Sequence, residues 1–97
     1  METIRSVNDV SIRLTGERWT HIVENHDEMA GMMNEVLDAI AEPDWITTGY
    51  RGALIAWRAI GHGRFLAAIY KELNMKDGFV ITAFTTSKPK KEPKIWP

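Results

Sequence analysis

The spacing of apolar residues changes its period near residue 44 of the chain. Before that point apolar residues recur at i, i+3, i+4 and i+7, the spacing that forms one face of a helix. This pattern predicts a helix from Glu17 to about His26, with Thr15 as its N-cap, and a second helix from about residue 31 to Ala41. Pro43 cannot continue a helix, so the second helix should end before it. The expected apolar stripes are Trp19, Ile22, Val23 and His26 in the first helix, and Met33, Val36, Leu37 and Ile40 in the second.

After residue 44 apolar and polar residues alternate with a period of two, which is typical of half-buried strands. The segment from Asn74 to Gly78 predicts a hairpin loop, because Asp-Gly accepts positive φ. A shorter alternating run, Val10–Leu14, predicts a strand before the helices, and Ile95–Trp96 can add a short closing strand. The four main strands should be Trp45–Tyr50, Ala53–Ile60, Arg64–Leu73 and Phe79–Thr86.

The order of these elements predicts an α+β fold in one domain. We expect two N-terminal helices packed on one face of a four- or five-stranded antiparallel sheet, because short loops join neighbouring strands. The domain should span residues 1–97, with its core between about residues 10 and 86 and a basic, Pro/Lys-rich tail over residues 87–97. The helices should cover alternate strand residues that include Ile55, Trp57 and Ile69 or their neighbours, which leaves the other sheet face available for a site.

The composition excludes several classes of protein. The chain has 97 residues and no cysteine, so disulfide scaffolds, zinc–cysteine sites and thiol catalysis are excluded. The longest apolar runs, Ala53–Trp57 and Phe65–Tyr70, are too short to span a bilayer. The N-terminal residues lack the apolar core of a secretory signal, so we expect a cytoplasmic protein with no membrane partner.

The net charge of −1 conceals a strong asymmetry between the two halves of the chain. Residues 1–44 hold ten acidic and three basic side chains, a net of −7, whereas residues 45–97 hold nine basic and three acidic ones, a net of +6. A basic surface attracts anions. The alternative is that the two halves simply complement each other within one fold.

Two histidines on the first predicted helix can carry chemistry. His21 and His26 are five residues apart, which places them about 140° apart around the helix axis. A pair of helical zinc ligands is normally four residues apart, so the spacing argues against a metal site. Imidazole titrates near neutrality, so either histidine can act as a general acid or base. The alternatives are a core or edge histidine at position 26 and a solvated one at position 21.

Basic and hydroxyl side chains on the predicted strands form a second group. Arg58 and Lys71 interrupt apolar strands and must face solvent or a partner. With Thr82 on a neighbouring strand, they would make a cationic face able to hold a phosphodiester. The alternative is the ordinary solvent face of an antiparallel sheet. The tail after Thr85 is basic and hydroxyl-rich, and can be either a phosphate clamp or a solvated tail.

Three stretches taken together resemble a known nuclease superfamily. They are RLTGERWTHIVENHDEM from Arg13, FLAAIYK ending at Lys71, and GFVITAFTTSKPKK from Gly78. In this order they are similar to small bacterial and phage proteins of the barnase–EndoU–colicin–RelE (BECR) superfamily, and most of all to its phage-type and BrnT-like toxin families. The resemblance covers about residues 12–96 and implies helices followed by a four- or five-stranded antiparallel sheet.

The resemblance also implies metal-independent RNA cleavage, with no cofactor. Such enzymes use a helix histidine, a basic residue on a central strand and a hydroxyl on a later strand. On this sequence His21 and His26 match the histidines, Lys71 the strand base and Thr82 the hydroxyl, so these four are the candidate catalytic residues. Either Arg51 or Arg58 can be the residue that stabilises the charge on the phosphate. The RNA-binding residues would be Arg51, Arg58, Thr85, Thr86, Lys88, Lys90 and Lys91.

Two functions from different classes are therefore open. The first is a small metal-independent endoribonuclease, either the toxin of a toxin–antitoxin pair or phage-encoded, with RNA and a cognate antitoxin or immunity protein as partners. The second is a catalytically inactive α+β module that binds a protein partner. The observation that would separate the two functions best is whether His26, Lys71 and Thr82 converge on one cleft.

Overall fold

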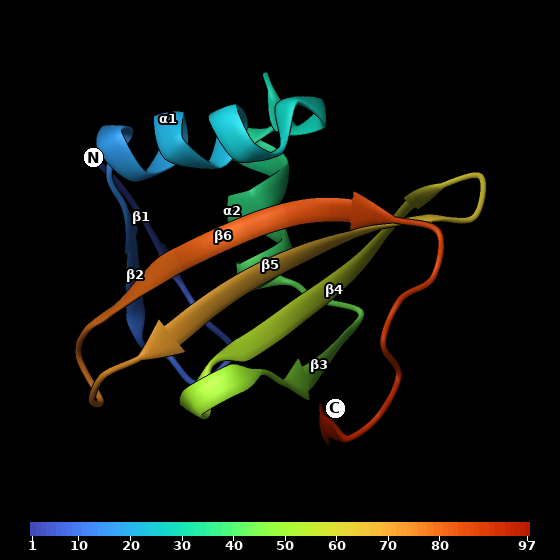
Figure 1. Cartoon of the computed structure of the whole chain (residues 1–97). Helices are drawn as coiled ribbons and strands as arrows, with labels where there is room; N and C mark the ends of the chain where they lie inside the picture. Colours follow the sequence, from blue (N-terminus) through green and yellow to red (C-terminus); the bar gives the residue numbers. More distant parts are fainter.

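The computed structural model describes residues 1–97 and shows an α+β arrangement (Figure 1). Two strands come first, then two helices, then five strands, an order close to the one that the sequence predicts, with two short 3-10 turns, η1 and η2. The elements are β1 (Glu2–Arg5), β2 (Ser11–Leu14), α1 (Gly16–Asn25), η1 (Asp27–Met29), α2 (Met33–Ala41), β3 (Trp45–Thr48), η2 (Tyr50–Gly52), β4 (Leu54–Gly61), β5 (Arg64–Glu72), β6 (Gly78–Thr86) and β7 (Lys94–Trp96).

All seven strands belong to one sheet, in the order β1-β2-β6-β5-β4-β3-β7. The pairings are antiparallel except between β2 and β6, which run parallel. The predicted class is therefore confirmed, but the prediction of four or five purely antiparallel strands is wrong. β1 has a single apolar residue, Ile4, and gives no alternation to detect. The predicted closing strand at Ile95–Trp96 is confirmed as part of β7, which pairs with β3.

A close backbone approach makes the β2–β6 pairing specific. Ile12 of β2 lies opposite Gly78 of β6. A Cβ atom on Gly78 would overlap the carbonyl oxygen of Lys71 and lie 2.6 Å from Cδ1 of Ile12. Only glycine leaves room for both neighbours at this point.

The two helices lie differently against the sheet. Helix α2 covers one face, whereas α1 lies along β6 (Figure 1). Beyond Phe79 the outer edge of β6 has no strand partner, and α1 and η1 cover this edge instead. Nη1 of Arg18 donates to the carbonyl of Ile81 at 3.3 Å, and the amide of Thr85 donates to Oε2 of Glu28 at 3.3 Å. These bonds satisfy an edge that would otherwise be free to pair with another chain.

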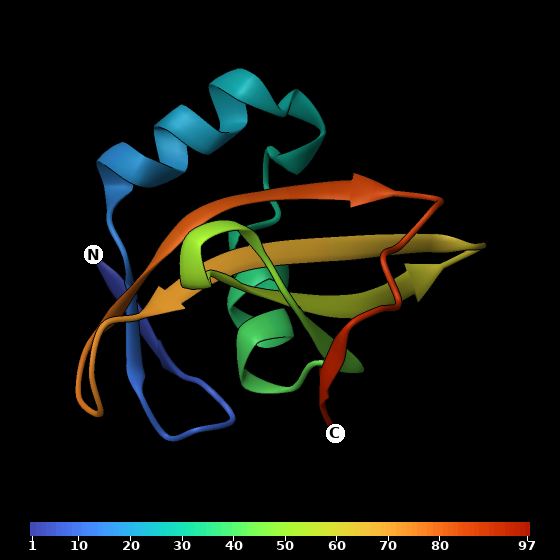
Figure 2. The ribbon, with the colours of Figure 1, turned by 60° about the horizontal axis from the view of Figure 1, so that its bottom comes forward.

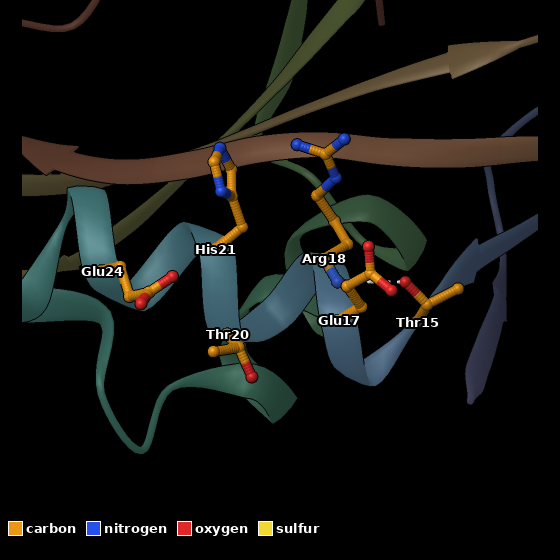
Figure 3. A pocket seen from close by; sticks show the side chains of 6 residues that line it. All are labelled: Thr15, Glu17, Arg18, Thr20, His21 and Glu24. Atoms are coloured by element: carbon orange, nitrogen blue, oxygen red, sulfur yellow. Dashed lines mark hydrogen bonds between the residues drawn. The ribbon is translucent and has the colours of Figure 1, made fainter.

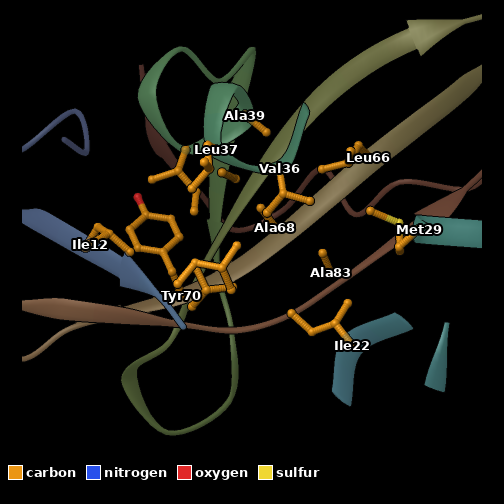
Figure 4. Close-up of a cluster of buried hydrophobic side chains, with 14 of the residues drawn as sticks. Ile12, Ile22, Met29, Val36, Leu37, Ala39, Leu66, Ala68, Tyr70 and Ala83 are labelled. Atoms are coloured by element: carbon orange, nitrogen blue, oxygen red, sulfur yellow. The ribbon is translucent and has the colours of Figure 1, made fainter. Parts of the chain in front are cut away.

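The main core lies between the helices and one face of the sheet (Figure 4). Its strand residues Ala56, Leu66, Ala68 and Tyr70 are buried to 0% exposure. Their alternation partners, which include Ile55, Trp57 and Ile69, point to the opposite face. The helices therefore cover the strand neighbours of these three residues, which the prediction included as the alternative set. Both faces of β4 and β5 are apolar, so the period of two does not tell which set meets the helices.

We call the face opposite α2 the open face; Thr82 and Phe84 of β6 and Ile55 and Trp57 of β4 lie on it. One end of this face carries an aromatic cluster. Trp45 stacks on Trp57 with ring centroids 6.0 Å apart and meets Phe65 edge-on at 5.7 Å, while Trp57 meets Phe84 at 6.3 Å. The C-terminal segment is tied to this end, since Nε1 of Trp45 donates to the carbonyl of Lys90 at 2.9 Å.

The turn η2 lies over the other end of the open face. Figure 2 shows this light-green turn arching in front of the sheet before the chain enters β4.

No helix of the structure is long and apolar enough to cross a membrane.

Candidate functional site

A pocket of about 530 Å³ lies on the open face, between the η2 turn and strands β4, β5 and β6. Its walls are mostly apolar, and its polar groups are two cations and one hydroxyl. A mostly apolar pocket with a few convergent polar groups is the usual form of a ligand site. The lining residues are Gly49, Tyr50, Arg51, Ala53, Ile55, Ile69, Lys71, Phe79, Ile81 and Thr82.

The pocket is electropositive, because it contains Lys71 and Arg51 and no carboxylate. The two ion pairs of the chain, Arg5–Asp9 and Arg13–Asp77, involve neither of these cations. The carboxylate that follows Lys71 in sequence, that of Glu72, accepts hydrogen bonds from side chains near β1 instead. Both cations are therefore available to an anion in the pocket.

Lys71 is half-buried, and the η2 turn passes over its side chain. A Cβ atom on Gly52 would lie 4.0 Å from Cε of Lys71. The aliphatic part of the lysine is thus held against the turn, which restricts where its ammonium group can go.

A β-bulge brings Thr82 into the pocket. Strand β6 pairs Val80 with Tyr70 and Thr82 with Ile69, which leaves Ile81 as an extra residue between the two pairs. A bulge re-aims the side chains around it. Strict alternation would put Phe79 and Thr82 on opposite faces, but with the bulge both residues line the same pocket. The sequence carries no signal for this bulge.

Arg51 belongs to a tight turn with unusual backbone angles. Its φ of 54° and ψ of 44° are left-handed, and Gly52 follows with a φ of 80°. Hydrogen bonds from the amide of Gly49 to the carbonyl of Ala53 (2.7 Å) and from the amide of Ala53 to that of Tyr50 (3.1 Å) close the turn. The guanidinium carbon of Arg51 lies 5.2 Å from the ring centroid of Tyr50, a cation–π contact.

His21 does not line this pocket. It lies on the surface of α1, in a second pocket of about 560 Å³ whose other lining residues are Thr15, Glu17, Arg18, Thr20 and Glu24 (Figure 3). The side chains of His21 and Arg18 point the same way, towards β6. His21 is thus exposed beside the covered edge of β6 and apart from Lys71 and Thr82.

His26 lies nearer to the open face, although it does not line the pocket either. It is the C-cap of α1, and its ring centroid lies 5.9 Å from that of Phe84. Phe84 is on the same face as Thr82 and two residues farther along β6. Residues two apart on a strand are separated by about 7 Å, so Phe84 lies one step along β6 from Thr82, and His26 contacts the open face there and not at the pocket.

Arg58 lies on the helix face, away from the pocket. It follows the core residues on β4, and its Nη1 donates to the carbonyls of Glu42 (2.7 Å) and Asp38 (3.5 Å) at the C-terminal end of α2. A cation there satisfies carbonyls that the helix leaves free and complements its dipole. Of the two arginines that were candidates for the charge stabiliser, only Arg51 lies in the pocket.

The hydroxyl residues at the end of β6 also lie outside the pocket. Thr85 points to the helix face, where its hydroxyl accepts a hydrogen bond from Arg64 at 2.7 Å. The hydroxyl of Thr86 accepts one from the amide of Lys88 at 3.1 Å.

The tail lysines do not form one clamp around the pocket. Nζ of Lys90 donates to the carbonyl of Thr48 at 2.7 Å, so this ammonium group holds the tail to β3. Lys91 lies beside Trp45 in a separate pocket of about 330 Å³. Lys88 is exposed and leaves its ammonium group free.

The structure adds pocket residues that the sequence did not single out, above all Tyr50 and Phe79. Tyr50 stands in a Gly-Tyr-Arg-Gly segment, where an aromatic residue in a glycine-flanked turn is the one available signal. No group of three or more His, Cys, Asp or Glu side chains is arranged to hold a metal ion.

Comparison with known proteins does not assign the chain to a family. No family model matches it, and no match was found among curated proteins or among solved structures. Any function must therefore be argued from the geometry of the pocket.

Proposed function

We propose that this protein is a small metal-independent endoribonuclease that acts in the cytoplasm. The observation that carries the proposal is the pocket itself, in which Lys71, Arg51 and Thr82 meet without a carboxylate. Two unpaired cations and a hydroxyl suit a phosphodiester, and the apolar walls suit a nucleobase or sugar. A toxin role, with an antitoxin or immunity protein as partner, follows from the sequence resemblance and belongs to the same proposal.

RNA cleavage through a cyclic phosphate requires three kinds of group. A base takes the proton of the 2′-hydroxyl, a cation stabilises the charge that grows on the phosphate, and an acid protonates the leaving 5′-oxygen. Lys71 and Arg51 supply the charge stabilisation. The hydroxyl of Thr82 donates a hydrogen bond to a phosphate oxygen and orients it. The 2′-oxygen then forms a bond to phosphorus as the bond to the 5′-oxygen breaks.

The role of the general base falls to a histidine outside the pocket. His26 is the better placed of the two, because its ring contacts Phe84 on the open face beside Thr82. The attacking 2′-hydroxyl is the one next to the phosphate held at Lys71, so the RNA must lie along β6 with this ribose on the Phe84 side of the pocket. The ammonium group of Lys71 is then the acid that gives a proton to the leaving 5′-oxygen. His21 lies in the separate pocket on α1, so its removal should affect cleavage less.

The catalytically inactive protein-binding module stays as a second candidate, and one observation favours it. No histidine, aspartate or glutamate lines the pocket, so the pocket itself holds no residue of the usual general-base type. Such a module would hold an anionic segment of a protein partner at Lys71 and Arg51 and would leave RNA intact.

Cleavage of mixed RNA in EDTA tests the proposal. Lys71→Met should slow cleavage by about 100- to 1,000-fold, the usual effect of removing one charge-stabilising group. His26→Ala should slow it by about 100- to 10,000-fold if this histidine transfers the proton. Thr82→Val, which keeps the shape of the side chain, should also slow it.

Lys76→Met is the matched control, because it removes the same charge from an exposed residue outside the pocket. It should leave the rate unchanged. Each variant is first checked for its fold by circular dichroism and thermal melting. A parent protein that never cleaves RNA would remove the nuclease proposal and favour the inactive module. If folded Lys71→Met and Thr82→Val cleave RNA as fast as the parent, the pocket is not the active site.

A further inference from the structure

The side chain of Tyr50 is among the exposed large hydrophobic residues of the chain. Its side chain stands at the rim of the pocket and Tyr50 is 77% exposed. Four aromatic rings of the sheet, those of Trp45, Trp57, Phe65 and Phe84, instead contact one another in the cluster at the far end of the open face. An aromatic ring left in water beside a cationic pocket has one face that can receive a planar ligand.

The turn that carries this ring is held in one conformation. Two hydrogen bonds close it, and it retains a left-handed Arg51. A non-glycine residue in that region costs on the order of 1–3 kcal/mol, and such strain is found mainly at functional sites. Arg51 lies over one face of the Tyr50 ring, with 5.2 Å between the guanidinium carbon and the ring centroid. The contact places the cation beside the ring, most of which is exposed.

We propose that Tyr50 and Arg51 form a stacking ledge for a nucleobase, and that this ledge makes the site selective for single-stranded RNA. The inference rests on the proposed function and adds the class of substrate. A nucleotide with its phosphate at Lys71 places its base beside the pocket rim, where the free face of Tyr50 can stack on it. In a duplex the bases are stacked on one another and their faces are inaccessible, so a protein ring can stack only on an unpaired base.

The ledge also explains why Arg51 and the ring of Tyr50 belong to one turn. Stacking on an aromatic side chain is tolerant of sequence, because every base has a π-face, and arginine adds a cation–π contribution. Arg51 can therefore contact both the ring and the RNA backbone. The site should bind unpaired segments with little preference among the four bases.

Binding of a 2′-O-methyl oligonucleotide tests the ledge without cleavage, since the methyl group blocks the attacking oxygen. Fluorescence anisotropy would compare a single-stranded oligonucleotide with the same sequence as a duplex, at one salt concentration. Tyr50→Ala should weaken single-strand binding by about 5- to 150-fold, the usual effect of losing one stacked base. Tyr50→Phe keeps the ring and should bind as the parent does.

Met75→Ala is the matched control, because Met75 is 88% exposed on a different loop. It should bind as the parent does, and duplex binding should be equally weak in the parent and in Tyr50→Ala. If Tyr50→Ala binds the single strand like the parent while Lys71→Met binds it more weakly, the ledge is wrong and the phosphate site stands. Equal losses for single strand and duplex would also overturn the ledge. Selective single-strand binding without cleavage of unmodified RNA would keep the ledge and overturn only the nuclease.

Discussion

The hydroxyl of Tyr70 is buried in the core and has no hydrogen-bond partner. Figure 4 shows the ring beside Ile12 and Leu37, so the apolar part of the side chain is well packed. A buried polar group without a partner costs about 1–3 kcal/mol. Tyr70→Phe keeps the ring and removes this cost, and should therefore raise the free energy of unfolding by about 1 kcal/mol. For a domain of this size that corresponds to a rise in Tm of about 4–8 °C.

The same residue predicts a stability that depends on pH. Burial, and secondly the negative charge of Glu72, raise the pKa of Tyr70 above its ordinary value of 10.0. Above about pH 10 the unfolded chain loses the phenol proton while the folded protein keeps it, so unfolding is favoured as pH rises. This loss has a limit of about 1.4 kcal/mol per pH unit and continues until the folded pKa is reached. The Tyr70→Phe variant has no phenol proton to lose, so this loss is absent. The difference in free energy of unfolding between this variant and the parent should therefore grow above pH 10.

Chemical denaturation at about pH 7 and at about pH 10.5 measures both effects. Tyr50→Phe is the matched control, since it removes the other tyrosine hydroxyl from an exposed position and should change neither value. In the Tyr50→Phe protein, phenolate absorbance of Tyr70 should rise together with unfolding. A Tyr70→Phe protein less stable than the parent at neutral pH would show that the hydroxyl has a hydrogen-bond partner, and would refute the reasoning.

Three further predictions concern the fold and the tail. Gly78→Ala should lower the free energy of unfolding by about 1–3 kcal/mol, because its Cβ would overlap backbone, while Gly16→Ala, with nothing within 4 Å, should be neutral in the same denaturation assay. Arg58→Met should destabilise by about 1–2 kcal/mol through loss of its bonds to the end of α2, without changing RNA binding; an equally stable variant would contradict this role. If the tail contacts RNA, Lys88→Ala and Lys91→Ala should each reduce the salt slope of single-strand binding by about 0.7, and an unchanged slope would leave these lysines as solvated residues.

The candidate site could be predicted from the sequence in part. Lys71 and Thr82 were singled out because a charged residue and a hydroxyl stand on apolar strands, and the structure brings both to one pocket with Arg51. Alternation also marked Arg58 as a cation that needs a partner. The alternation could not show that this partner is the C-terminal end of α2, because the contact joins residues that are sixteen or more positions apart in the chain.

The histidines show where a pattern along one helix stops being informative. Their spacing predicted that His21 and His26 lie on different sides of one helix, but α1 ends at Asn25 and His26 is its non-helical C-cap, so the helical spacing does not apply to it. Neither histidine lines the pocket, because α1 lies along the edge of β6 and not over the open face. The position of a helix relative to a sheet depends on packing between distant residues, which no local spacing encodes.

The sequence by itself determined the type and order of the main elements, because a period near four or of two is a local property of consecutive residues. Tertiary structure alone decided how these elements combine. It set which apolar face of β4 and β5 meets the helices, the parallel pairing of β2 with β6, and the bulge at Ile81 that turns Thr82 towards Lys71. Each of these choices depends on contacts between residues far apart in the chain, where the free energy of packing outweighs any local preference.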